Sequence, residues 1–234
     1  YEIMVVTGVQ TCAFRSYAKV GDTDIKLDAW SMRRAADGSY AVDIKASDFV
    51  LKLTLTPTQA PLFQGDGGYS RKGPRPSQAS YYYSQPQLKT SGTVSRNGAA
   101  PQAVTGTTWL DHEWSSQVLD ADATGWNWIG ANLDDGGALM AFQIRDKTGG
   151  KLWAHATWRD SAGKVTQYGP GDVSFTPQTL WRSPRTNIEY PVAATIVTGG
   201  TGGSGRTTWQ ATPLQPDQEL DSRRSTGAIY WEGA

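Results

Sequence analysis

The chain has 234 residues and carries 22 Lys and Arg against 22 Asp and Glu, so its formal net charge is zero. This length suits one large β domain or two small ones, and the neutral charge without a long basic run argues against a nucleic-acid partner. No apolar stretch approaches the roughly 18 residues of a membrane span. The N-terminus lacks the charged, apolar and small-residue regions that follow one another in a signal peptide. The 10 Trp, 10 Tyr and 26 Gly favour strands joined by turns.

The first residues of the chain differ in character from the rest. Residues 6–16, VTGVQTCAFRS, resemble the translation of a sequencing-library adapter. We therefore predict that the chain is a metagenomic or contig fragment, that residues 1–16 are a non-native, adapter-derived segment, and that Cys12 has no function. Because Cys12 is the single cysteine, an intramolecular disulfide and a multi-cysteine metal site are excluded.

Alternating apolar and polar side chains begin after this segment. Residues 48–56 place apolar side chains on one face and polar side chains on the other, which predicts a half-buried strand. Residues 24–32 and 39–46 read as two earlier strands, joined through the hairpin signal Asp37-Gly38. These three segments predict an antiparallel meander.

A Gly- and Pro-rich stretch follows at residues 57–78 and contains GDGGYSRKGP. A phosphate-binding loop would need a following helix, which Pro74 and Pro76 exclude, so we predict a structural turn. The hairpin signal Asn97-Gly98 leads into a strand that ends at Trp114. We predict the remaining strands at residues 80–88, 90–95, 126–133, 138–146, 151–158, 172–176, 190–197, 206–212 and 228–231. Turn signals about every ten residues suit a β-barrel or sandwich.

The segment WLDHEWSS, residues 109–116, places two carboxylates, an imidazole and two indoles close together. On a strand, Asp111 and Glu113 share one face, roughly 6–7 Å apart, and His112 and Trp114 share the other. Two acids close together among apolar side chains raise each other's proton affinity. One could then act as a Brønsted acid while its ionised neighbour orients water or stabilises a cation. With equal weight, the acids could pair with arginine or backbone donors and hold a corner of a barrel.

Other catalytic and binding patterns are weaker. The chain has two histidines, His112 and His155, and no G-x-S-x-G elbow, which weakens a serine hydrolase without excluding it. No H-x-H or H-E-x-x-H spacing supports a metal site, and we predict neither metal nor cofactor. The aromatic side chains within residues 81–83 and 126–128 could line a ligand cavity or simply pack in the sheet.

Six motifs in chain order resemble the carotenoid 1,2-hydratase family, also called AttH-like or lipocalin-like predicted secreted hydrolases. They are ASYYYSQPQL (79–88), VTGTTWLDHEWSS (104–116), GWNWIGANLDDGGALM (125–140), YPV (190–192), DQEL (217–220) and YWEGA (230–234). The resemblance covers most of residues 63–234. It implies an all-β fold of two consecutive antiparallel, lipocalin-like (calycin-like) barrels.

Family members usually begin with an earlier EWWY-type motif and continue past YWEGA through a Gly-rich strand. The resemblance therefore implies a chain truncated at both ends, with residues 17–90 as the remainder of an incomplete first domain. Residues 91–234 are then the second domain, without its last strands.

The resemblance also implies a chemistry, in which an acidic residue protonates a terminal alkene and aromatic rings stabilise the tertiary cation before water adds. The matching acid is Asp111, with Glu113 as its partner and His112 as a further catalytic candidate. The substrate-binding candidates are Trp109, Trp114, Trp126, Trp128, Tyr81 and Tyr83.

We therefore expect a hydro-lyase of the carotenoid 1,2-hydratase type, or a carboxylic ester hydrolase, acting on an isoprenoid alkene or lipophilic ester. One alternative is a lipocalin-like protein that binds a hydrophobic ligand without chemistry. A second is a carbohydrate-active β protein, because carboxylates roughly 6.5–9.5 Å apart also suit an inverting glycosidase. The resemblance further implies a secreted, periplasmic or cell-envelope location, and the sequence predicts no oligomeric state.

Overall fold

A computed structural model describes residues 16–115, 121–200, 205–223 and 228–233 of the chain. Regular structure in these ranges consists of strands in antiparallel sheets, so the predicted all-β class is confirmed. None of the described residues forms a helix long and apolar enough to cross a membrane. Of the segment predicted to be non-native, residues 1–15, which include Cys12, lie outside the described ranges.

Contacts divide the chain into two compact units. The first comprises the chain up to Ala60 together with Gln85–Leu110, and the second comprises Pro61–Ser84 together with all residues from Asp111. The boundary near residue 90 that the sequence suggested stays a prediction.

The first unit is built on an antiparallel meander. Its strands are β1 (Ser16–Ala18), β2 (Asp24–Leu27), β3 (Trp30–Arg34), β4 (Tyr40–Lys45) and β5 (Phe49–Thr56), each paired with the next. The single strand predicted at residues 24–32 is wrong, because Asp28 has a φ of 51° and turns the chain between β2 and β3. The predicted turn between β3 and β4 is confirmed, with Gly38 at a φ of 86°.

The meander is extended by β8 (Ala79–Arg96), whose C-terminal part pairs with β5. The two strands predicted at residues 80–88 and 90–95 are therefore one strand, which bends at Gln87, with a φ of 56°, without ending. The predicted turn at Asn97-Gly98 is confirmed, since both residues have positive φ, as a two-residue hairpin turn requires. This turn leads into β9 (Gln102–Trp114).

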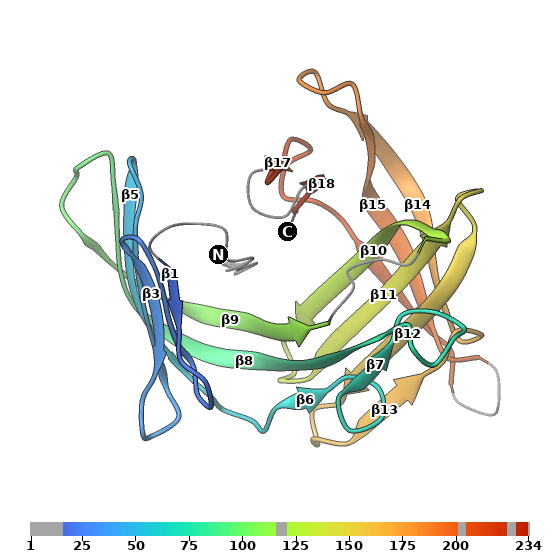
Figure 1. The fold of residues 1–234 in the computed structure, drawn as a ribbon, viewed down its shortest axis with the longest axis horizontal. Coiled ribbons are helices and arrows are strands. Elements are labelled where there is room, and N and C mark those ends of the chain that lie inside the picture. The colour runs from blue at the N-terminus through green and yellow to red at the C-terminus, as the bar shows by residue number, and fades with distance from the viewer. Residues whose placement is uncertain (1–15, 116–120, 201–204, 224–227, 234) are drawn as a thin grey trace. The chain divides into compact units, whose positions relative to one another are not determined.

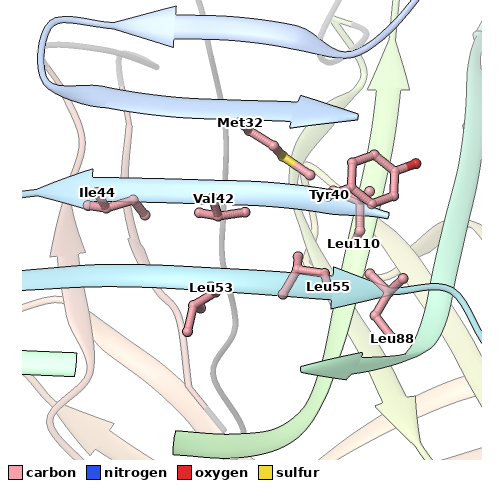
Figure 2. Packing of buried hydrophobic residues seen from close by; sticks show 8 residues of the cluster. All are labelled: Met32, Tyr40, Val42, Ile44, Leu53, Leu55, Leu88 and Leu110. Atoms are coloured by element: carbon pink, nitrogen blue, oxygen red, sulfur yellow. The ribbon is translucent and has the colours of Figure 1, made fainter. Parts of the chain in front are cut away.

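Apolar side chains from one face of the meander form the core of the first unit. Figure 2 shows the eight buried residues, which are Met32, Tyr40, Val42, Ile44, Leu53, Leu55, Leu88 and Leu110. On β4 and β5 these residues alternate with exposed ones, which is the period-two pattern that the sequence predicted.

The second unit contains three further sheets (Figure 1). A four-stranded sheet consists of β10 (Ala123–Asn132), β11 (Ala138–Asp146), β12 (Lys151–Arg159) and β13 (Val165–Tyr168). A three-stranded sheet consists of β14 (Val173–Arg182), β15 (Glu189–Thr198) and β16 (Thr207–Ala211), and a pair of short strands consists of β17 (Glu219–Asp221) and β18 (Ile229–Trp231).

The segment predicted as a loop at residues 57–78 contains two short strands of the second unit, so that part of the loop prediction is wrong. They are β6 (Leu62–Phe63) and β7 (Tyr69–Arg71), and both pair with the N-terminal part of β8. A tight turn joins them at Gly65, whose φ is 71° and where a Cβ would collide with the Tyr69 carbonyl. Two- and three-residue strands are too short for a period-two pattern to be visible in sequence.

The two faces of the β10–β13 sheet have different roles. One face contributes to a second apolar core, in which Leu139, Ala141 and Ala154 pack with Val173 and Ile196 of the β14–β16 sheet. On the opposite face, the cross-strand register aligns Trp128 with Phe142 and Phe142 with His155. This second face contributes Trp128 and Phe142 to the candidate active site.

Candidate active site

Asp111 and Glu113 lie near the end of β9 and meet hydroxyl groups of β8. Ser84 Oγ donates a hydrogen bond to Asp111 Oδ1 over 2.5 Å, and Ser80 Oγ donates to Glu113 Oε1 over the same distance. Because alternate residues of a strand share a face, both acids point to the side that Ser80, Tyr82 and Ser84 occupy.

Lys72, which follows β7, is the counter-ion of Glu113. Its Nζ lies 2.9 Å from Glu113 Oε1 and donates to Ser70 Oγ over 3.1 Å. The ammonium also lies over the ring of Phe142, 4.1 Å from the centroid, and over that of Tyr82 at 4.7 Å. The Lys72 side chain is 20% exposed, and burial lowers its pKa while the charges of Glu113 and Asp111 oppose that shift.

Tyr82 joins this ion pair to Asp111 and to the β10–β13 sheet. Trp128 Nε1 donates to Tyr82 Oη over 3.0 Å, and the Tyr82 hydroxyl is hydrogen-bonded to Asp111. Burial, followed by the charges of Asp111 and Glu113, raises the Tyr82 pKa well above its usual value. The phenol therefore keeps its proton and donates a hydrogen bond to Asp111. We call Asp111, Glu113, Lys72, Tyr82, Ser80 and Ser84 the carboxylate cluster.

His155, on β12, is a neutral histidine next to Phe142. The His155 ring centroid lies 6.0 Å from that of Phe142, and its Nε2 is 3.1 Å from Thr157 Oγ1. Burial, with a further contribution from the Lys72 charge, lowers the His155 pKa to about 4. The imidazole is therefore uncharged at neutral pH.

A third acid, Glu232, lies close enough to Asp111 for their charges to interact. It follows β18 directly, and its main-chain N–H donates to the Gln218 carbonyl oxygen over 3.0 Å. Burial first, and the Asp111 charge second, raise the Glu232 pKa to about 7. A carboxyl group with this pKa is about half protonated near pH 7 and mostly protonated below it.

Four residues predicted from the sequence lie on the other face of β8 and β9. The rings of Tyr81 and Trp114 stack with centroids 5.5 Å apart, and both side chains are exposed. Tyr83 Oη lies 3.2 Å from His112 Nδ1, and burial lowers the His112 pKa. The strand alternation separates these four residues from Asp111 and Glu113.

The three remaining predicted tryptophans have different surroundings. Trp128 contacts the carboxylate cluster through Tyr82, as described above. Trp126, on the same strand, is exposed, and Trp109 is buried and belongs to the first unit. Ser116, the last residue of WLDHEWSS, lies outside the described ranges.

Sequence reasoning did not single out Lys72, Tyr82 or Glu232. Lys72 lies within GDGGYSRKGP, which indicated a turn, and no spacing rule connects that turn to Glu113. Tyr82 could have been found, because a strand that brings Ser80 and Ser84 to the acids must bring Tyr82 to them as well. Glu232 lies within YWEGA, which served only as a family motif.

A separate groove lies on the first unit, over β2 to β5. Charged side chains line most of it, namely Lys26, Asp28, Asp43, Lys45 and Lys52, with Trp30 at one side. It shares no residue with the carboxylate cluster, and its lysines and aspartates are of the kind expected on a solvated sheet face.

Comparison with known proteins gives one family and two related folds. The family model described as AttH-like matches residues 10–234. A crystal structure of a candidate AttH from Nitrosomonas europaea is 55% identical, with a TM-score of 0.86 over 93% of this chain and 66% of that one. The crystal structure of kievitone hydratase from Nectria haematococca is 16% identical, with a TM-score of 0.67 over 85% of this chain and 60% of that one.

These matches confirm the lipocalin-like fold class that the sequence predicted. The chain spans less than two thirds of the length of either neighbour. No curated protein matches it.

Proposed function

Because the chain belongs to the AttH-like family, we propose that it is an enzyme that adds water to an apolar small molecule, or hydrolyses one, by carboxylic-acid catalysis at the carboxylate cluster. An isoprenoid alkene and a lipophilic ester are the two substrate classes. The similar fold of kievitone hydratase supports a hydration reaction, and the neighbouring rings support an apolar substrate.

One observation carries the proposal: hydroxyl groups hold Asp111, and aromatic rings contact its neighbours in the carboxylate cluster. Ser84 and Tyr82 hold its carboxylate. The Trp128 indole N–H donates to Tyr82, and the Phe142 ring lies against the Lys72 ammonium. A carboxylate stabilises a developing carbocation by its charge, and ring faces add to that stabilisation. A group held by two donors is also pre-oriented, so little reorganisation is needed during the reaction.

Hydration of an alkene requires three events at such a site. A carboxylic acid gives its proton to one alkene carbon, which forms a C–H bond and leaves a cation on the other carbon. Water then bonds to the cation, and a carboxylate takes the proton that the water releases. In an ester, the same acid would protonate the leaving oxygen.

The test is turnover of an acyclic terpene alkene, a lipophilic nitrophenyl ester and a nitrophenyl glycoside by the wild type and by Asp111→Asn. We expect activity on the alkene or the ester and a loss of about 10²- to 10⁴-fold in the variant, the usual range for removing an acid–base group. Asp43→Asn is the control, because Asp43 is an exposed carboxylate of the first unit that pairs with Lys52.

Three outcomes would contradict the proposal. An unimpaired Asp111→Asn enzyme would show that this carboxylate has no part in the chemistry. Turnover of the glycoside alone would favour a carbohydrate-active protein. Binding of a hydrophobic dye without product from any substrate would favour the lipocalin-like binding protein.

The binding protein has one observation in its favour. The charge of Glu113 is already compensated by Lys72, and Asp111 already accepts two hydrogen bonds. Such saturation also suits a purely structural network. Dye displacement measured in the wild type and in Asp111→Asn separates the two functions, because a binding protein would keep its affinity in the variant.

A further inference from the structure

Gln64 follows β6 directly, and its main chain is fixed against β8. Leu62 of β6 lies opposite Ser84 of β8 in the register, and the Gln64 main-chain N–H donates to the Tyr82 carbonyl oxygen over 3.1 Å. The Gln64 and Ser84 side chains are both completely buried, so bulk water does not compete for their polar atoms. The position of Gln64 relative to Ser84 is therefore set by the sheet.

Two hydrogen bonds connect Gln64 to Asp111 through the hydroxyl group of Ser84. Gln64 Nε2 donates to Ser84 Oγ over 2.9 Å, and Ser84 Oγ donates to Asp111 Oδ1 over 2.5 Å. A hydroxyl group has one proton to donate. Because the amide N–H occupies a lone pair of Ser84 Oγ, the Ser84 proton is directed to Asp111 and not to Gln64. The Asp111 carboxyl group is planar, so holding Oδ1 also fixes the direction of Oδ2.

The oxygen of the Gln64 amide has no hydrogen-bond partner among the described residues, although it is buried. A buried amide oxygen that gives up its hydrogen bonds to water without a replacement destabilises the folded state. Methionine has a similar size and lacks this oxygen, so it would fill the same space without that penalty. Stability alone therefore does not explain a glutamine here, and the contact with Ser84 is what the amide supplies and methionine would not.

We propose that Gln64 is a positioning residue of the reaction, which acts on Asp111 through Ser84. This rests on the function proposed above and adds a residue to that site. The Gln64 side chain is buried and does not touch the substrate. It keeps the Ser84 proton directed to Asp111, so the carboxyl group meets the substrate in one orientation and proton transfer needs little reorganisation.

The test is a double-mutant cycle that compares the wild type, Gln64→Met, Ser84→Ala and the variant with both substitutions. Turnover is measured on the alkene or ester that the wild type converts. Gln64→Met should lower kcat about three- to tenfold, because the Ser84 proton is no longer directed to Asp111. Ser84→Ala should lower kcat about tenfold or more, because it removes that donor altogether.

Two features of the kinetics distinguish positioning from a general disturbance of the site. The double variant should be no slower than Ser84→Ala, because Gln64 acts only through Ser84. KM should stay within about twofold of the wild type in Gln64→Met, because the side chain does not touch the substrate. Additive losses of kcat in the double variant, or a loss carried by KM alone, would overturn the proposal.

Unfolding in urea is a second measurement, which does not depend on turnover. Gln64→Met should be at least as stable as the wild type, because it loses the unpartnered oxygen together with one hydrogen bond. Lower stability, or failure to fold, would show that Gln64 stabilises the fold through this hydrogen bond and would overturn the proposal. If Ser84→Ala fails to fold, the kcat, KM and stability of Gln64→Met decide.

The matched control is Gln167→Met, the same substitution at a glutamine beside the same turn. Gln167 Nε2 donates to the Gly65 carbonyl oxygen over 2.8 Å, and its side chain is exposed. Its kcat should equal that of the wild type. A loss of kcat in Gln167→Met as large as in Gln64→Met would show that a change in the turn, and not the contact with Ser84, slows the reaction.

Failure of this inference differs from failure of the proposed function. If Asp111→Asn is inactive while Gln64→Met keeps the wild-type kcat, Gln64 is not a positioning residue, and the proposed function stands. If Asp111→Asn keeps full turnover, or the wild type yields no product, the proposed function itself fails and this inference fails with it.

Discussion

The two faces of β8 and β9 in the second unit are built from alternate residues of the same two strands, and they differ in chemistry. One face carries Asp111, Glu113 and Tyr82, whose polar atoms are linked to neighbouring side chains. The other carries Tyr81 and Trp114, whose stacked rings are 53% and 50% exposed. A shift of one residue in strand register would exchange the two faces.

This difference shows that closeness in sequence is a poor guide to a shared site in a strand. His112 lies between Asp111 and Glu113 in the chain, yet it contacts Tyr83 on the opposite face. Lys72 is distant in the chain, yet it forms the ion pair with Glu113. If the two faces have different roles, the effect of a substitution on turnover or stability should depend on the face on which the residue lies.

The largest expected effect comes from removing the cation of the acidic face. Lys72→Met leaves Glu113 without its counter-ion, in a site where Lys72 is only 20% exposed. We expect the free energy of unfolding to fall by about 2 kcal/mol, less than for a fully buried pair because Glu113 is 40% exposed. Urea denaturation measures the loss.

The matched control for this prediction is Lys52→Met in the first unit. Lys52 pairs with Asp43 at 3.7 Å, but its side chain is 66% exposed. Its removal should change the unfolding free energy by about 0.5 kcal/mol or less. Equal losses in the two variants would show that the Lys72 pair is no more than a surface contact.

A smaller effect should appear as a pH dependence of stability through His155. Burial lowers its folded-state pKa to about 4, against about 6.5 in the unfolded chain. The unfolded state therefore binds more protons between these values, so the His155 contribution is complete above pH 6.5 and is lost as pH falls through about 4. We expect this loss to be about 1–2 kcal/mol.

The measurement compares unfolding free energies of the wild type and His155→Gln at pH 7 and pH 4.5. Carboxylates titrate in both proteins, so only the difference between the two profiles reports on His155. His112→Gln is the matched control, because His112 is exposed whereas His155 is partly buried. Parallel profiles for the wild type and His155→Gln would contradict the prediction.

The next prediction concerns the hydroxyl that links Trp128 to Asp111. Tyr82→Phe removes that hydroxyl and leaves the ring, so Asp111 loses one donor and Trp128 loses its acceptor. We expect about a tenfold loss of turnover, equivalent to one hydrogen bond to a charged group. Tyr81→Phe, the same change on the exposed face, should have no effect on turnover. Equal losses of turnover in both variants would contradict the prediction that only the face carrying Asp111 takes part in the reaction.

Much of the fold could be predicted, because period-two patterning and turn residues act locally. Strand β11 (Ala138–Asp146) has the bounds that the sequence predicted, between two Gly-containing turns. Strands β1, β6, β7, β13 and β17 were missed, because strands of two to four residues depend on their partners rather than on their own pattern.

The candidate site could be predicted only in part, for the same physical reason. The alternation along β9 correctly separates Asp111 and Glu113 from His112 and Trp114. It contains no information about the segments that the fold brings to each face. The approach of Lys72 to Glu113, and of Glu232 to Asp111, depends on long-range pairing that one sequence does not encode locally.

The smallest expected effect separates two tryptophans that the sequence treated alike. Trp128→Phe removes the indole N–H that holds Tyr82, so we expect turnover to fall about three- to tenfold. Trp114→Phe keeps an aromatic ring against Tyr81 on the exposed face, and its turnover should stay within about twofold of the wild type. Steady-state kinetics on the same substrate measure both variants. A larger loss in Trp114→Phe than in Trp128→Phe would show that the substrate contacts the exposed aromatic face. Trp114 lies on the face opposite to Asp111, so it could affect turnover only by contacting the substrate.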